Sequence, residues 1–114
     1  MEISHSFLNS KAAIDRMGDV DIYLEIVQYF ALSLDASTAE ISAAFQAGNM
    51  PEATRLAHSL KGNCATVGAE ALRETCAALE ILCRAGDKQK AEALFEEMRP
   101  ELVYLKQALL DMKL

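Results

Sequence analysis

Apolar residues recur every three or four positions along most of this 114-residue chain, and this spacing constrains the fold more than any other feature. A period near 3.6 residues gives a helix one apolar face, whereas a half-buried strand would need strict alternation. Glycines interrupt the pattern at the places where helices should stop. The pattern predicts a short helix over 11–17 and four long helices over 20–47, 51–67, 69–85 and 88–112.

Residues that favour helix ends flank the 51–67 stretch. Asn49 or Met50 lies at the cap position, and Pro51 suits a first turn, where no intrahelical donor is needed. Gly68 follows the last periodic residue and fits a left-handed C-terminal cap.

For the 20–47 helix, the predicted apolar stripe consists of Ile22, Tyr23, Ile26, Phe30, Leu34, Ile41 and Phe45.

Four long helices with short links, each apolar on one side, predict an all-α fold. We expect an antiparallel up-down-up-down four-helix bundle with a short extra N-terminal helix at one end. Residues 1–114 should form a single domain, because this length suffices for one core and no repeat or linker interrupts the chain. Pro100 should kink or split the last helix near Arg99.

Composition narrows the classes of function. The net charge of −6 argues against a nucleic-acid partner, whose phosphates require a basic surface. The apolar stretches are shorter than the ~18 residues of a membrane span, and the N-terminus lacks the basic and apolar regions of a secretion signal. We therefore expect a cytoplasmic protein without membrane insertion. Three cysteines fall on apolar stripes without a C-x-x-C pair and are expected to be core residues: Cys64, Cys76 and Cys83.

The 51–67 helix should present one histidine to water. Its apolar residues fall within about 100° of arc, and His58 projects about 150° from the middle of that arc. Lys61 lies one turn along on the same outer face, and Gly62 lies four residues on. A glycine inside a helix costs about 1 kcal/mol relative to alanine, so it needs a reason. Together an exposed imidazole, a cation and cleared space could accommodate a bulky anion on the ring nitrogen. The predicted buried stripe is Ala53, Leu56, Ala57, Leu60, Cys64 and Val67.

The run Ala57-His58-x-x-Lys61-Gly62, followed by Gly68-Ala69, resembles the signature of histidine-containing phosphotransfer (HPt) domains. These are the histidine relay modules of bacterial two-component phosphorelays, and the likeness covers nearly the whole chain. The resemblance implies that His58 accepts a phosphoryl group from a receiver-domain aspartate and passes it to another receiver aspartate. It further implies that Lys61 stabilises the phosphoryl charge and that Gly62 provides steric clearance.

Glu80 lies twelve residues after Gly68, and His58 lies ten residues before it. At about 1.5 Å per residue, the two side chains should reach nearly the same level on antiparallel neighbouring helices. Glu80 could then accept a hydrogen bond from His58 Nδ1 and leave Nε2 free as nucleophile. The resembling family often has glutamate or glutamine here; the alternative is a solvated glutamate without a role. Three arginines are expected to be surface charges: Arg55, Arg73 and Arg84. Of these, Arg55 and Arg84 could border a docking face.

The resemblance also implies the partners, which are receiver (response-regulator) domains and a hybrid sensor histidine kinase. Mg²⁺ would belong to the partner receiver, so we expect neither a cofactor nor a metal on this chain. No G-x-x-x-x-G-K loop is present, so the protein should not bind ATP or phosphorylate itself. We expect a monomeric phosphotransfer intermediate rather than an enzyme.

The sequence leaves two alternatives open. The chain could be a non-catalytic helical-bundle interaction module, a degenerate HPt domain that only binds a partner. It could also be an ordinary four-helix adaptor in which His58 has no role. In the second case Lys61 would be an ordinary surface lysine.

Overall fold

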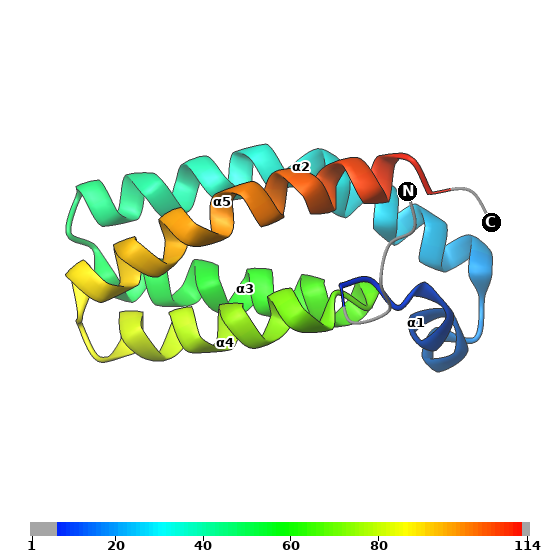
Figure 1. The fold of residues 1–114 in the computed structure, drawn as a ribbon, viewed down its shortest axis with the longest axis horizontal. Coiled ribbons are helices and arrows are strands. Elements are labelled where there is room, and N and C mark those ends of the chain that lie inside the picture. The colour runs from blue at the N-terminus through cyan, green and yellow to red at the C-terminus, as the bar shows by residue number, and fades with distance from the viewer. Residues whose placement is uncertain (1–6, 113–114) are drawn as a thin grey trace.

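The computed structural model describes residues 7–112, and this part of the chain contains five helices and no strand (Figure 1). The all-α class and the set of one short and four long helices are therefore confirmed. None of these helices is both long enough and apolar enough to cross a membrane. The helices are α1 (Ser10–Met17), α2 (Val20–Gln46), α3 (Met50–Val67), α4 (Glu70–Arg84) and α5 (Lys88–Leu110).

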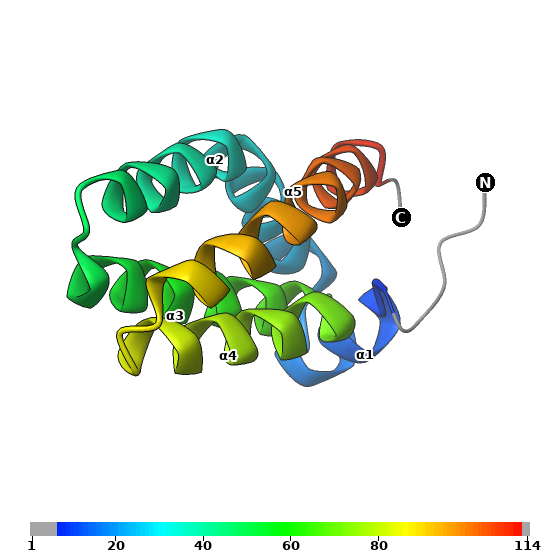
Figure 2. The same ribbon diagram turned by 60° about the vertical axis from the view of Figure 1, so that its left-hand side comes forward.

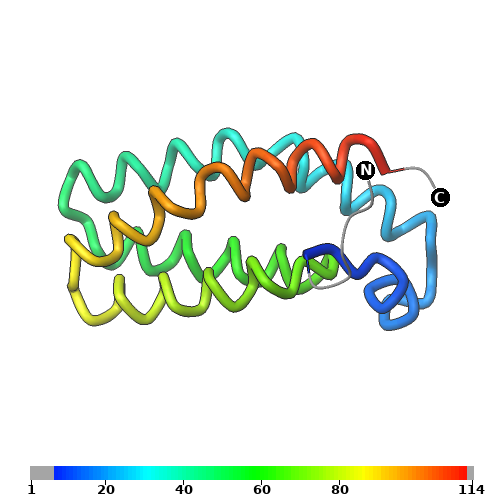
Figure 3. Tube along the Cα trace, in the orientation of Figure 1, coloured from blue at the N-terminus to red at the C-terminus, as the bar shows by residue number. Residues whose placement is uncertain are grey.

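The four long helices form an antiparallel bundle in which each packs against two others. The α2–α3 and α4–α5 turns lie at one end and the α3–α4 turn at the other, as the chain trace in Figure 3 shows. Helix α3 packs on α2 and α4, and α5 completes the ring against α2 and α4. The short helix α1 lies across the end where α3 meets α4 and packs on α2 and α3 (Figure 2).

The predicted helix ends lie within two residues of the observed ones, and the predicted caps of α3 are present. The Asn49 side chain accepts a hydrogen bond from the Glu52 N–H at 3.2 Å and caps α3, which begins at Met50, one residue before the predicted start. Gly68 ends α3 with a left-handed φ of 90°. Its carbonyl accepts a 2.8 Å hydrogen bond from the N–H of Asn9, the residue that caps α1. This bond ties α1 to the α3–α4 turn.

The predicted buried stripe of α3 is confirmed at all six positions. The predicted stripe of α2 is wrong at Ile22, which is exposed, and Ile26 is only half-buried. Helix α2 carries more apolar residues than one face can bury, so part of the set must point outward. The smaller side chains Val27, Ala31 and Ala44 occupy the buried face instead.

Pro100 does not split the last helix, contrary to one of the two expected outcomes. Helix α5 runs without a break from Lys88 to Leu110, with the proline inside it. Proline removes one backbone donor, but Met98 and Leu102 on either side are both buried in the core. Packing on both sides of the proline therefore keeps the two halves in one helix.

The three cysteines are free and buried in the core. The pKa of the Cys64 thiol on α3 is raised by its hydrogen bond with Cys76 on α4 and by burial. Burial likewise raises the pKa of Cys83. The raised pKa values of Cys64 and Cys83 keep those two thiols protonated and poorly nucleophilic, in agreement with a packing role.

Candidate functional site

Helix α3 carries His58 on its outer face. The His58 side chain is 66% exposed, whereas Ala57 and Leu60 on the same helix are buried. The helical period places the ring almost opposite the buried stripe, so packing of the stripe turns the ring outward. The imidazole is therefore accessible from solution on the side away from the core.

The α3–α4 turn brings Glu80 to the level of His58. Only Gly68 and Ala69 separate the two helices, which fixes them as antiparallel neighbours. His58 Nδ1 lies 3.2 Å from Oε2 and 3.3 Å from Oε1 of the Glu80 carboxylate. An ionised carboxylate can only accept hydrogen bonds, so Nδ1 must carry the proton in this contact. In the neutral ring, Nε2 then has a free lone pair that faces away from Glu80.

Glu80 is the one charged side chain that is buried within residues 7–112, with 6% of its side chain exposed. Two cations hold it: Lys61 Nζ lies 2.7 Å from Oε1, and an Arg84 guanidinium nitrogen lies 2.7 Å from Oε2. The hydrogen bond from Lys61, together with those from Arg84 and His58, lowers the pKa of Glu80 from 4.5 to about 2. Burial acts in the opposite direction and is outweighed, so Glu80 is ionised at neutral pH.

The charges around His58 do not cancel. Lys61 and Arg84 supply two positive charges against one negative charge on Glu80, so the cluster has a net positive charge of one when the ring is neutral. A positive surplus beside an exposed nucleophile favours a negatively charged reactant. The arrangement can therefore attract an anionic group to Nε2 and stabilise it there.

Gly62 leaves an open position beside the imidazole, one turn after His58 on α3. A Cβ built at this residue meets no atom within 4 Å outside its own helix backbone. The bundle itself therefore has room for a larger side chain, and internal packing does not explain the glycine. The free space lies on the solvent side of α3, where an approaching molecule would use it.

The structure brings together His58, Lys61 and Glu80, and it adds Arg84, whose contact with Glu80 the sequence interpretation missed. A usable signal was present, because Glu80 and Arg84 are spaced i and i+4 on α4, where opposite charges meet. The other two arginines lie outside this cluster. Arg55 pairs with Glu52 on α3, and Arg73 pairs with Glu70 at 3.0 Å.

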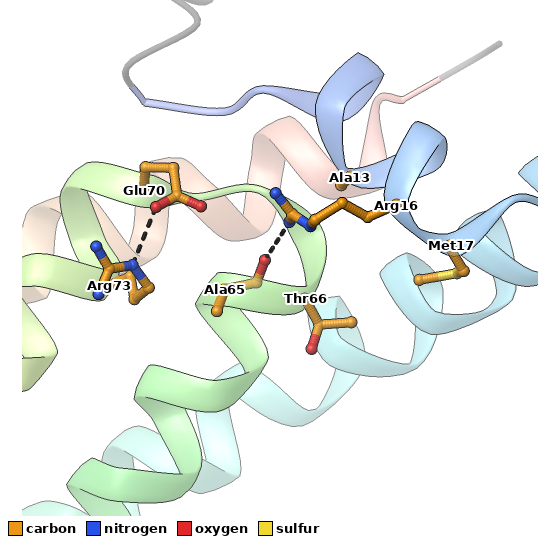
Figure 4. A pocket seen from close by; sticks show the side chains of 7 residues that line it. All are labelled: Ala13, Arg16, Met17, Ala65, Thr66, Glu70 and Arg73. Carbon is orange, nitrogen blue, oxygen red and sulfur yellow. Dashed lines mark hydrogen bonds and ion pairs between the residues drawn. The ribbon is translucent and has the colours of Figure 1, made fainter.

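Two surface hollows lie along the α3–α4 seam on either side of the cluster. The nearer one adjoins Arg84 and is lined by Met50, Pro51, Thr54, Cys83, Arg84 and Gly86. The farther one is drawn in Figure 4 and is lined by Ala13, Arg16, Met17, Ala65, Thr66, Glu70 and Arg73. There Arg16 donates to the Ala65 carbonyl at 2.9 Å, and Arg73 is bonded to Glu70. Both guanidinium groups are engaged within the chain, so this hollow adds no charge to the cluster around His58.

Three comparisons with known proteins give matches to this chain. The family model described as Hpt domain matches residues 25–112 of the chain. The phosphorelay intermediate protein rdeA of Dictyostelium discoideum is 25% identical over 96 residues, which are 84% of this chain and 38% of that protein. This chain therefore spans well under half the length of that curated relative.

Two solved structures share the fold. The crystal structure of histidine-containing phosphotransfer protein B (HptB) from Pseudomonas aeruginosa PAO1 superposes with a TM-score of 0.81 at 29% identity, covering 90% of each chain. The HPT domain from a sensor hybrid histidine kinase of Shewanella superposes with a TM-score of 0.82 at 18% identity, covering 93% of this chain and 92% of that one. The second likeness, at lower identity, concerns the fold alone.

Proposed function

The chain belongs to the Hpt domain family, whose function is histidine phosphotransfer in two-component signalling, and we propose that His58 is its phosphoryl-accepting residue. One observation carries the proposal. An exposed imidazole is hydrogen-bonded through Nδ1 to a buried carboxylate and lies in a cluster with a surplus of positive charge. A histidine that forms and releases an N–P bond needs this combination of access, orientation and charge.

In the proposed reaction, the donor is an aspartyl phosphate on a receiver domain. The Nε2 lone pair of neutral His58 attacks the phosphorus, and the N–P bond forms as the P–O bond to the aspartate breaks. The electron pair of that bond returns to the aspartate carboxylate. The proton stays on Nδ1 in its hydrogen bond to Glu80, whose negative charge stabilises the positive charge that develops on the ring. The reverse reaction with a second receiver aspartate regenerates neutral His58.

The neighbouring residues take three further roles in this proposal. Lys61 stabilises the charge on the transferred phosphoryl group, and Gly62 leaves room for its oxygens and for the approaching receiver. Glu80 fixes the tautomer and the orientation of the ring. Phosphoryl transfer passes through a loose transition state, so positioning and charge supply most of the catalysis.

We propose receiver domains and a hybrid sensor histidine kinase as partners of a monomeric, cytoplasmic protein. The partner receiver would hold the Mg²⁺, and this chain would need no cofactor, bind no ATP and have no autokinase activity. The docking surface would surround His58 and include Pro51 and Ala65 on α3 together with exposed residues of α2. A carrier must release its partner after each transfer, so we expect a contact below about 1,200 Å².

Transfer between two receivers tests the proposal. A receiver domain carrying ³²P on its aspartate is mixed with the protein, which is then separated and offered to a second, unlabelled receiver. The proposal predicts label on this protein that is labile in acid and stable in alkali, followed by its passage to the second receiver. Binding of receivers without any labelling of this chain would instead favour a degenerate domain that only binds.

A further inference from the structure

The Lys61 ammonium group is not free in the structure. It lies 2.7 Å from Glu80 Oε1, and its side chain is only 30% exposed. Arg84 lies 2.7 Å from the other oxygen of the same carboxylate. Two cations therefore share one buried anion, although a single good ion pair would neutralise it.

A phosphoryl group on His58 Nε2 would compete with Glu80 for these cations. It carries nearly two negative charges at neutral pH and presents three acceptor oxygens, whereas the carboxylate carries one charge. Lys61 is well placed to respond, because it lies one turn from His58 on the same helix and has a flexible four-carbon side chain. If Lys61 left Glu80 and no other cation remained, the buried carboxylate would be unpaired, which destabilises the protein.

Arg84 is that second cation. It extends from α4, four residues after Glu80, and its guanidinium group donates a hydrogen bond to Oε2. The Arg84 side chain as a whole is 65% exposed. We propose that phosphorylation of His58 transfers Lys61 from Glu80 to the phosphoryl group, while Arg84 remains on Glu80 and keeps the carboxylate aligned with Nδ1. This inference rests on the proposed function of His58 and makes Arg84 a positioning residue that acts through Glu80.

The exchange has a specific chemical purpose. Without a remaining cation, a buried Glu80 would tend to take up a proton, and it would then accept the Nδ1–H bond less strongly. The ring would lose its negative partner at the stage when Nε2 gains its bond to phosphorus and the ring carries positive charge. Arg84 prevents this loss, so Lys61 can leave at low cost.

The first experiment observes the exchange directly. Phosphoramidate serves as a small-molecule phosphoryl donor, which removes any effect of receiver docking, and ³¹P NMR follows the phosphohistidine. In protein labelled with ¹⁵N, the Lys61 Nζ resonance should shift on phosphorylation, while the Arg84 Nε–H resonance should stay in place. A shift of the Arg84 resonance with Lys61 unchanged would overturn the inference.

The second experiment tests whether Arg84 acts through Glu80. Arg84→Gln should slow phosphorylation by phosphoramidate about fivefold, as expected for loss of a largely exposed charge contact. Arg84→Lys should restore most of the rate. Arg73 lies about three turns from Arg84 on α4 and is bonded to Glu70, so Arg73→Gln should leave the rate unchanged. In a Glu80→Gln background, Arg84→Gln should have no further effect, because no carboxylate is left to neutralise.

The outcomes separate this inference from the proposed function. If Arg84→Gln slows the reaction equally with and without the Glu80 carboxylate, Arg84 contacts the phosphoryl group itself and the inference is wrong, although His58 remains the acceptor. If Arg84→Gln behaves like Arg73→Gln, Arg84 has no part in the exchange. If the wild-type protein takes no phosphoryl group from phosphoramidate or from a labelled receiver, the proposed function itself fails.

Discussion

Glu80 Oε2 lies 3.2 Å from His58 Nδ1, joining a carboxylate that is almost fully buried to an imidazole that is largely exposed. The buried partner is held from three directions, by Lys61, Arg84 and the packing of α4 against α3. A fixed carboxylate restrains the ring without covering Nε2. The bundle therefore supplies rigidity to a nucleophile that must remain open to a partner.

The ion pairs of Glu80 predict a specific dependence of stability on pH. Lys61 in particular, with Arg84 and His58, holds the pKa of Glu80 at about 2 in the folded protein, below its ordinary value of 4.5. The unfolded chain then binds the proton more readily than the folded protein does. The stabilisation by ionised Glu80 is complete above about pH 5, where the unfolded chain is ionised as well, and is lost as the pH falls through 4.5 towards 2.

Comparing wild type with Glu80→Gln isolates this contribution. Urea unfolding across pH 2.5–7 should give a difference in unfolding free energy that is constant above about pH 5 and shrinks at lower pH. The pH-dependent part should be at most about 3 kcal/mol, and less where water screens the exposed Arg84. A difference that does not change with pH would contradict the assignment of the ionised form.

Gly62→Ala should raise the unfolding free energy of the protein and slow phosphoryl transfer to it. The residue is helical, and an added Cβ meets nothing within 4 Å, so the helix gains about 1 kcal/mol of unfolding free energy. The same methyl group would lie on the outer face of α3, one turn from His58, where the receiver is proposed to dock, so transfer from a receiver should slow. Asn63→Ala, at the next exposed helical position, should stabilise without slowing transfer. Unchanged transfer in Gly62→Ala would show that the clearance has no function.

Gly68→Ala should destabilise the bundle by more than about 2 kcal/mol, measured by urea unfolding. Its left-handed φ of 90° disfavours any Cβ, and here a Cβ would also collide with the Asn9 carbonyl. Gly48→Ala is the matched control, because Gly48 also has a positive φ but open space around it. Equal losses in the two variants would mean that the close contact with α1 contributes nothing.

Tyr23→Phe should lower the unfolding free energy by about 1 kcal/mol. The buried Tyr23 hydroxyl donates a 2.8 Å hydrogen bond to the Val67 carbonyl, which ties α2 to the last turn of α3. The bond lies nine residues along α3 from His58, so phosphorylation by phosphoramidate should proceed at the wild-type rate. Unfolding by urea measures the first effect, and an unchanged midpoint would show that the bond does not contribute.

The helices and their ends could be predicted because their causes are local. Asn49 and Gly68 cap α3 through contacts within a few residues, and a period of 3.6 residues identified its buried face. The same method was less accurate for α2, where Ile22 is exposed, because periodicity cannot choose among surplus apolar residues. Which of them are buried depends on how α3 and α5 pack against the helix.

The candidate site was predictable in part for the same reason. His58, Lys61 and Gly62 lie on one helix, so their common face follows from spacing alone. The level of Glu80 followed from the short α3–α4 turn. The burial of Glu80 and its contacts with two cations could not be predicted, because they depend on how α4 is rotated about its axis against α3. The role of Arg84 became visible only with Glu80 in place.

His58 is the proposed carrier of the phosphoryl group, and the chain's two histidines allow this to be tested directly. His5, the other histidine, lies outside the residues that the structure describes and serves as the control position. The protein and its His58→Gln and His5→Gln variants are incubated with a ³²P-labelled receiver, and alkali-stable label on each chain is counted. We predict nearly equal label on wild type and His5→Gln and none on His58→Gln; label that persists in His58→Gln would show that another residue carries the phosphoryl group.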